Sequence, residues 1–122
     1  LAATMAAAQP QTNAFHVCGN YCGPGYCNGK YLDETKCDGS VKPEVSHGNT
    51  SCADACCHMH DHCCGHEPPF KTCNKRIVDC LAKCSHLDTS CHLHGIPVPA
   101  GGVEVAMDIV EDWCCGSPCP KE

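Results

Sequence analysis

The residues best suited to chemistry lie in two short segments of the chain. Residues 21–25 read Tyr-Cys-Gly-Pro-Gly, and residues 56–63 read Cys-Cys-His-Met-His-Asp-His-Cys. Glycine lets a loop curl until successive backbone carbonyls converge, and calcium prefers such carbonyls together with a carboxylate. We therefore expect a Ca²⁺ site made of the Asp61 carboxylate and of three loop carbonyls, those of Tyr21, Gly23 and Gly25.

His60 directly precedes Asp61, so an imidazole would lie beside the bound cation. A neutral imidazole, whose reference pKa is about 6.5, can take a proton from water at physiological pH. A neighbouring divalent cation polarises an ester carbonyl and stabilises the oxyanion that forms. The combination predicts ester hydrolysis by activated water, and no serine stands in the nucleophile-elbow pattern of a covalent mechanism.

The two segments together resemble the secreted, calcium-dependent phospholipases A2. The resemblance covers residues 21–84 and rests on Cys-Cys-x-x-His-Asp-x-Cys, supported by Tyr-Cys-Gly-x-Gly. It implies hydrolysis of the sn-2 ester of phospholipids to a lysophospholipid and a free fatty acid. It also implies that His60 activates the water and that the Gly23 N–H assists the oxyanion. The calcium ligands it implies are Tyr21, Gly23, Gly25 and Asp61, and the disulfides are Cys22–Cys57, Cys56–Cys80 and Cys63–Cys73.

One position departs from the pattern of many animal members, which carry an aspartate directly after the cysteine that matches Cys73. Here that position is Asn74, which can accept a hydrogen bond from an imidazole but cannot stabilise an imidazolium ion by charge. We expect Asn74 to orient His60 more weakly and the reaction to be slower. The short connection from Cys63 to Cys73 places the chain nearer the plant-like branch. The alternative function is a catalytically weak or inactive binding protein or toxin on the same scaffold.

The cysteine spacing predicts how the elements around these segments are arranged. Ser51 and Asp54 have capping-box spacing, so a helix is expected from about Ser51 to Gly65, and a second one from about Thr72 to His86. Three cysteine pairs have the same sum of residue numbers, as antiparallel segments require: Cys63 with Cys73, Cys56 with Cys80, and Cys52 with Cys84. Because sixteen cysteines allow many other pairings, this register is a hypothesis.

A helical wheel at about 100° per residue sorts the first helix into faces. His60 and Asp61 share one flank with Cys57 and Cys64, whereas His58 and His62 point elsewhere and are expected to be solvated. Asp54 lies close to that flank, but its place near the helix start favours simple stabilisation of the helix N-terminus. A zinc site is a second interpretation of the local histidines, and the wheel disfavours it. Its candidate ligands are His58, His60, His62 and His66.

The composition predicts the class of fold. Sixteen cysteines in 122 residues, with an aromatic content of only 5%, indicate a disulfide scaffold made in an oxidising compartment. We expect a secreted single domain over residues 1–122 that is mainly α, with two long antiparallel helices cross-linked by disulfides. A calcium-binding loop within a long irregular stretch, residues 16–49, and a shorter C-terminal helix complete it. That helix is expected to pack its apolar stripe on the core, formed by Val103, Met107, Val110 and Trp113.

Net charge and hydropathy limit the classes of binding partner that we expect. The net charge of −6 argues against nucleic acid, and no apolar run approaches the roughly 18 residues of a membrane-spanning helix. Residues 1–8 lack the features of a full signal peptide, so we expect a processed chain. The expected partner is a phospholipid aggregate or membrane surface, bound peripherally. Candidate contacts are Leu1, Met5, Phe15, Tyr26, Tyr31 and Phe70. Head-group preference, oligomeric state and eight pairings stay open, those of Cys18, Cys27, Cys37, Cys64, Cys91, Cys114, Cys115 and Cys119.

Overall fold

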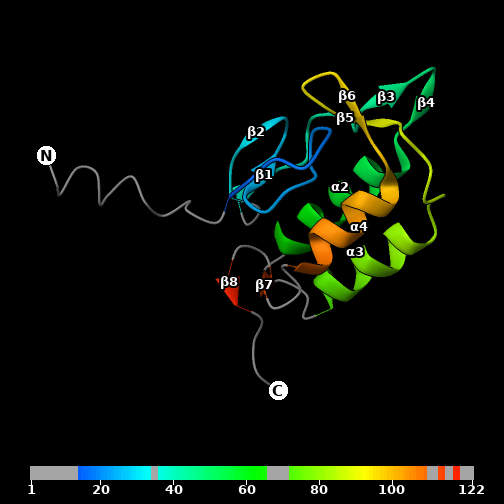
Figure 1. Cartoon of the computed structure of the whole chain (residues 1–122). Helices are drawn as coiled ribbons and strands as arrows, with labels where there is room; N and C mark the ends of the chain where they lie inside the picture. The colour runs from blue at the N-terminus through cyan, green and yellow to red at the C-terminus, as the bar shows by residue number, and fades with distance from the viewer. Residues whose placement is uncertain (1–13, 34–35, 66–71, 110–112, 115–116, 119–122) are drawn as a thin grey trace, which may run out of the picture.

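The computed structural model describes residues 14–33, 36–65, 72–109, 113–114 and 117–118. Within these residues the chain forms three helices and four small antiparallel strand pairs (Figure 1). The helices are α2 (Cys52–Gly65), α3 (Cys73–Ala82) and α4 (Ala100–Ile109). The strand pairs are β1 (Tyr26–Cys27) with β2 (Lys30–Tyr31), β3 (Val45–Ser46) with β4 (Asn49–Thr50), β5 (Cys91–Leu93) with β6 (Ile96–Val98), and β7 (Trp113–Cys114) with β8 (Ser117–Pro118).

The expectation of a mainly α fold with two long helices is wrong. The helices have 14, 10 and 10 residues, and α3 ends at Ala82 rather than near His86. The stretch expected to be one long loop contains two hairpins, and a third hairpin lies between α3 and α4. The structure is a set of short helices and small strand pairs held together by disulfides.

Three of the hairpins close in the same way. Their two-residue turns are Asn28-Gly29, His47-Gly48 and His94-Gly95, and every residue in these turns has a positive φ between 51° and 80°. Two successive left-handed residues are typical of the type I′ turn, whose twist matches that of the flanking strands. Asn28-Gly29 is therefore a hairpin signal present in the sequence, and the residues on both sides are too few to show an alternating pattern.

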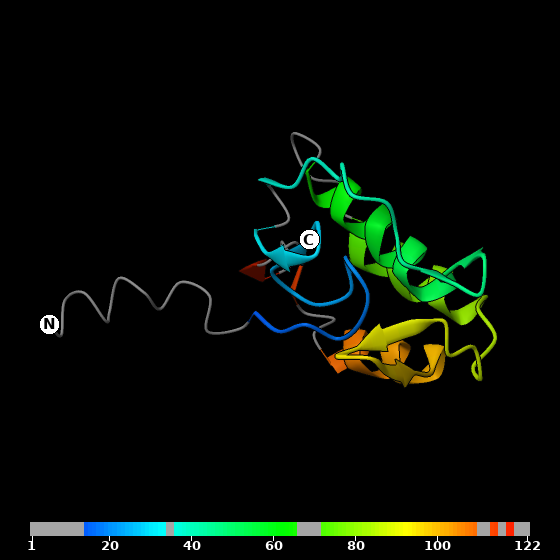
Figure 2. The ribbon, with the colours of Figure 1, turned by 90° about the horizontal axis from the view of Figure 1, so that it is seen from above.

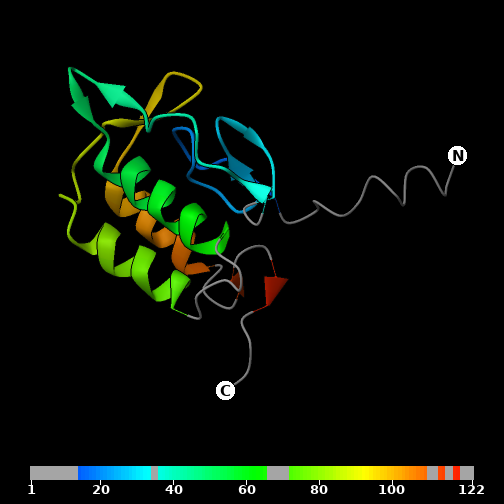
Figure 3. The same cartoon turned by 180° about the vertical axis from the view of Figure 1, so that it is seen from behind.

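The predicted cysteine register of the two central helices is confirmed. Disulfides join Cys52 to Cys84, Cys56 to Cys80 and Cys63 to Cys73. Because sulfur bridges replace a thick apolar core here, α2 and α3 need few large side chains between them. Ile77 and Leu81 of α3 are nearly inaccessible and belong to the same core as Val103 of α4. Figure 3 shows α3 beside both of the other helices.

The ends of the helices follow local signals. The Asp54 N–H donates to Ser51 Oγ (3.2 Å), so Ser51 caps α2 as predicted. Of the predicted C-terminal stripe, Val103 is fully buried in α4, but Trp113 lies in β7 because the helix ends at Ile109. Val110 lies outside the described residues. No helix of the described part is long and apolar enough to cross a bilayer.

Candidate functional site

The glycine loop, residues 19–25, is attached to α2 and to the segment that precedes it. A disulfide joins Cys22 to Cys57 of α2, with 5.0 Å between the Cα atoms, as the resemblance implies. The loop also pairs with the preceding segment, because Val17 N–H donates to Cys22 O (2.8 Å) and Phe15 N–H to Pro24 O (3.0 Å). Gly23 has a φ of 140°, and a Cβ there would lie 2.0 Å from the Phe15 carbonyl oxygen, so only glycine fits.

One face of α2 is directed at this loop. Asp54, Cys57, His58 and Asp61 have the spacing i, i+3, i+4 and i+7, which places them along one side of a helix. Asp54 binds loop amides, Cys57 forms the disulfide, and the His58 ring lies 4.4 Å from the Tyr21 ring between centroids. His58 is thus not the solvated histidine that was expected, whereas His62 is exposed as expected.

Asp61 lies next to the segment that follows the glycine loop. Its side chain is buried (1% exposed), and a carboxylate oxygen lies within 4.8 Å of the sulfurs of the Cys27–Cys37 disulfide. Cys27 belongs to β1, which directly follows the glycine loop. The fold therefore brings Asp61 to the segment that directly follows the glycine loop, and its joint binding of a cation with the loop carbonyls stays a prediction.

His60 is buried next to Asp61. Its Nδ1 lies 3.7 Å from Asp61 Oδ1, and its Nε2 lies 3.8 Å from the sulfur of Cys64. The side chain is nearly enclosed by protein, and this burial lowers the pKa of His60 from 6.5 to about 4, because the charged form loses its hydration. The imidazole is therefore neutral at physiological pH, although it is a weaker base than its reference pKa indicates.

The donor set fits a calcium ion in chemical type. The Gly23 carbonyl accepts a hydrogen bond from Tyr26 N–H (3.1 Å), and the Gly25 carbonyl accepts one from Leu32 N–H (3.0 Å). A carbonyl oxygen has two lone pairs, so accepting one hydrogen bond does not by itself prevent a carbonyl from binding a cation. A buried carboxylate with several carbonyls is the combination of hard oxygen ligands that calcium takes.

Asn74 lies at the start of α3 and is buried (8% exposed). The neighbouring Cys73 is bonded to Cys63, which follows His60 by three residues. This disulfide brings Asn74 to the end of α2 that carries His60 and Asp61. Its role in orienting the imidazole stays a prediction.

The zinc interpretation finds no support in the described part of the chain. There, every group of three or more potential ligand atoms within 4.8 Å of one another consists of cysteine sulfurs, joined in one case by Asp61. The cysteines of these groups are in disulfides and offer no thiolate. His66 lies outside the described residues.

Two polar residues outside the proposed calcium site, but linked to the loops around it, escaped the sequence analysis. Glu44 and His92 lie far apart in the chain, yet His92 Nδ1 is 2.6 Å from Glu44 Oε1, and the His92 N–H donates to Glu44 Oε2 (3.0 Å). No motif marks either residue, because the contact arises only when the hairpin β5–β6 folds back onto the loop. The disulfides Cys18–Cys91 and Cys27–Cys37 were also left open by the sequence.

Comparison of the chain with protein-family models, curated proteins and solved structures finds no match. The resemblance to phospholipases A2 therefore rests on the two sequence motifs.

Proposed function

We propose that the protein is a secreted enzyme that hydrolyses the sn-2 ester of phospholipids with the help of Ca²⁺. The observation that carries the proposal is the shared face of α2, from which Cys57 anchors the glycine loop and Asp61 reaches the Cys27–Cys37 disulfide that directly follows the loop. Two motifs that are separated by about 30 residues in the sequence thus meet at one place. The neutral imidazole of His60 lies directly beside that place.

His60 would act as the general base. Its Nδ1 faces the side of Asp61, so we assign Nδ1 as the proton acceptor from water and Nε2 as the nitrogen that keeps its hydrogen. Burial makes the imidazolium formed in this step unfavourable, and Asn74 cannot offset its charge. Turnover is accordingly expected to be slow, in agreement with the replacement of aspartate by asparagine at position 74.

The calcium ligands in this proposal are Asp61 and three loop carbonyls, those of Tyr21, Gly23 and Gly25. When bound, the cation would supply charge stabilisation for the ester oxygen as negative charge develops on it. The protein's contribution is to hold the acid on α2 and the carbonyls on a loop that is fixed at several points. The Gly23 N–H is a further candidate donor to the oxyanion.

The partner would be a phospholipid aggregate that the enzyme contacts from one side. Among the candidate membrane contacts, Phe15 and Tyr31 are exposed, at 40% and 54%. Tyr26 is excluded, because it is buried and its ring stacks on His16 at 3.9 Å between centroids. Leu1, Met5 and Phe70 lie outside the described residues. The six disulfides given above agree with formation in an oxidising compartment.

The test is hydrolysis of vesicles made of a phosphatidylcholine with different acyl chains at sn-1 and sn-2. The wild-type protein is expected to release only the sn-2 fatty acid, and a calcium chelator is expected to abolish the release. His60→Gln should lower the rate by at least about a hundredfold, since general-base catalysis typically contributes 10²–10⁴-fold.

His62→Gln is the matched control, because His62 lies on the same helix but is exposed to solvent. It is expected to retain the wild-type rate. Equal rates for His60→Gln and the wild type, or release that continues in the chelator, would contradict the proposed function.

A further inference from the structure

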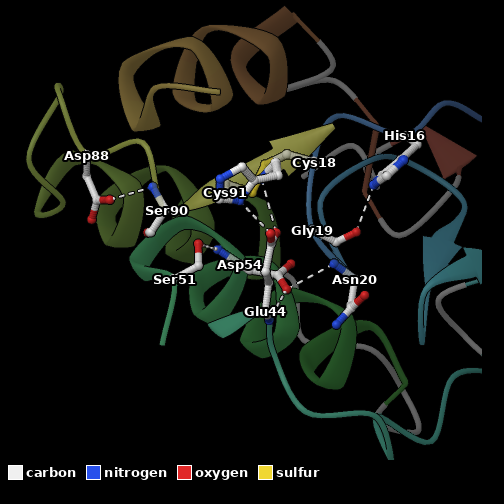
Figure 4. A network of polar contacts seen from close by, with 11 residues as sticks. His16, Cys18, Gly19, Asn20, Glu44, Ser51, Asp54, Asp88, Ser90 and Cys91 are labelled. Carbon is white, nitrogen blue, oxygen red and sulfur yellow. Dashed lines mark hydrogen bonds and ion pairs between the residues drawn. A yellow bond between two sulfur atoms is a disulfide. The ribbon is translucent and has the colours of Figure 1, made fainter. Parts of the chain in front are cut away.

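The buried carboxylate of Asp54 makes its contacts in two loops rather than in its own helix (Figure 4). Oδ1 accepts a hydrogen bond from Tyr21 N–H (2.9 Å), and Oδ2 accepts from Asn20 N–H (2.9 Å) and from Glu44 N–H (2.7 Å). The residue is 0% exposed. Hydrogen bonds from backbone N–H groups to an ionised carboxylate are roughly twice as strong as neutral ones, so Asp54 is a strong tie between α2 and these loops.

These contacts bear on Tyr21, whose carbonyl is one of the proposed calcium ligands. The Tyr21 N–H is held by Asp54, and the next residue, Cys22, is bonded to Cys57. The peptide that contains the Tyr21 carbonyl therefore lies between two attachments to the same helix. The Tyr21 hydroxyl is held as well, by Asn28 Oδ1 (3.0 Å).

Asp54 and Asp61 lie on the same side of α2, one near each end of the segment that carries the glycine loop and β1. Seven residues correspond to about two helical turns, or about 10 Å along the axis, so both side chains leave the helix in nearly the same direction. Asp61 lies near the disulfide of Cys27, after the loop, whereas Asp54 holds the start of the loop. Asp54 is thus too far from Asp61 to share a cation with it, but it determines where the loop starts relative to Asp61.

The surroundings leave little freedom to the Asp54 carboxylate. A Cβ at Gly19, which has a φ of 66°, would lie 2.5 Å from Asp54 Cγ, so the carboxylate packs directly on that glycine. Gly19 N–H donates in turn to the carbonyl of His92 (2.9 Å) in the hairpin β5–β6. Figure 2 shows the loop running beside this hairpin. The hairpin and α2 therefore hold the start of the loop from two sides.

We propose that Asp54 is a positioning residue for the calcium site: it orients the Tyr21 carbonyl and thereby sets the affinity for calcium, without touching the cation. This assignment rests on the proposed function, since it names what shapes the same site. It also replaces the expectation that Asp54 serves mainly to stabilise the start of the helix.

The test compares Asp54→Asn with Glu44→Gln. The amide in Asp54→Asn keeps the size of the side chain but presents an NH₂ group to backbone N–H donors, so at least one of the loop bonds is lost. Glu44→Gln removes the same amount of charge from a neighbouring side chain while the Glu44 N–H stays on Asp54. The control thus separates positioning from a general loss of negative charge near the cation.

Three quantities are measured for both variants and the wild type. They are the calcium dissociation constant, the hydrolysis rate at saturating calcium, and the hydrogen-exchange rates of the Asn20 and Tyr21 amides in chelator. Loss of an outer partner of a metal site typically costs 10–100-fold in affinity. In Asp54→Asn we expect calcium affinity to be at least about tenfold weaker and both amides to exchange faster. The hydrolysis rate of this variant at saturating calcium should be close to that of the wild type. Glu44→Gln should stay within about twofold of the wild type.

Equal loss of calcium affinity in both variants would overturn the assignment, because charge alone would then explain the effect. Wild-type affinity and exchange in Asp54→Asn would overturn it as well. Should Asp54→Asn not fold, Gly19→Ala displaces the same carboxylate from the opposite side and is expected to weaken calcium binding in the same way. A wild-type chain that binds no calcium would contradict the proposed function, and the amide exchange of Asn20 and Tyr21 would still decide whether Asp54 holds the loop.

Discussion

His60 shows how strongly its surroundings change one side chain. The sequence predicts an imidazole near its reference pKa, whereas burial in α2 lowers the pKa to about 4. An enzyme that uses such a base gains a neutral imidazole over a wide pH range and loses driving force for proton transfer. The same burial makes the stability of the fold depend on pH.

Below pH 6.5 His60 is protonated in the unfolded chain, whereas in the folded chain it becomes protonated only near pH 4. The stabilisation that depends on neutral His60 is therefore complete above pH 6.5 and is lost as the pH falls to about 4. Relative to His60→Gln, whose side chain does not titrate, the wild-type free energy of unfolding should fall by about 3 kcal/mol over this range. Denaturant unfolding in chelator, with the disulfides intact, measures the difference. Parallel pH profiles for the two proteins would contradict it.

At the scale of elements, the antiparallel arrangement of α2 and α3 could be predicted from the residue numbers of their cysteines. Cysteines on two antiparallel helices must pair with a constant sum, and three pairs do. The two-residue strands could not be predicted from hydrophobic alternation, because each covers a single repeat of a pattern that is recognised only over about 4–8 residues. Their turns were visible in part, since Asn28-Gly29 favours a hairpin.

In the candidate site, too, some contacts could be predicted from the sequence and others could not. The bridge between the glycine loop and α2, Cys22–Cys57, could be predicted from the resemblance, because both cysteines lie in recognisable motifs. The contacts of Glu44 with Asp54 and with His92 could not, because they join segments separated by 10 and 48 residues that share no local pattern. Burial of Asp54 is likewise decided by the loop folded over it rather than by its place in the helix.

The disulfides of the helix pair should differ more in their effect on activity than on stability. Replacing both Cys52 and Cys84 by alanine is expected to lower the free energy of unfolding by about 3 kcal/mol, because with Cys56–Cys80 intact this disulfide closes an additional loop of only about eight residues. Both must be replaced, since a free Cys84 thiol would lie 3.9 Å from the sulfur of Cys56 and could attack that bridge.

The double variant should keep its hydrolytic rate at low temperature, because Cys52 lies about two helical turns from His60. Removing Cys63 and Cys73 should cost a similar amount of stability, about 3 kcal/mol, because they also close a short loop, yet reduce activity, because that disulfide positions Asn74. Denaturant unfolding and the vesicle assay measure the two effects. The reverse pattern, with activity lost only in the Cys52 and Cys84 variant, would contradict the placement of the site.

In the whole molecule, disulfides take much of the stabilising role that a larger hydrophobic core has in bigger proteins. The glycine loop is attached to α2 through Cys22, to the hairpin β5–β6 through the Gly19 N–H, directly after the Cys18–Cys91 disulfide, and to the segment before β3 through the Asp54 carboxylate. Loss of any one attachment leaves the other two. Because these attachments fix the backbone of the loop, binding of a ligand by the loop would cost little conformational entropy.

The most direct test of the account is a crystal structure of the wild-type protein grown with millimolar calcium and in its absence. The account predicts a single calcium ion held by the Asp61 carboxylate together with the carbonyls of Tyr21, Gly23 and Gly25, beside the His60 imidazole. Asp61→Asn crystals grown under the same conditions should lack the ion. A wild-type structure in which the ion binds elsewhere, or in which the loop carbonyls point away from Asp61 with no ion between them, would contradict the central claim.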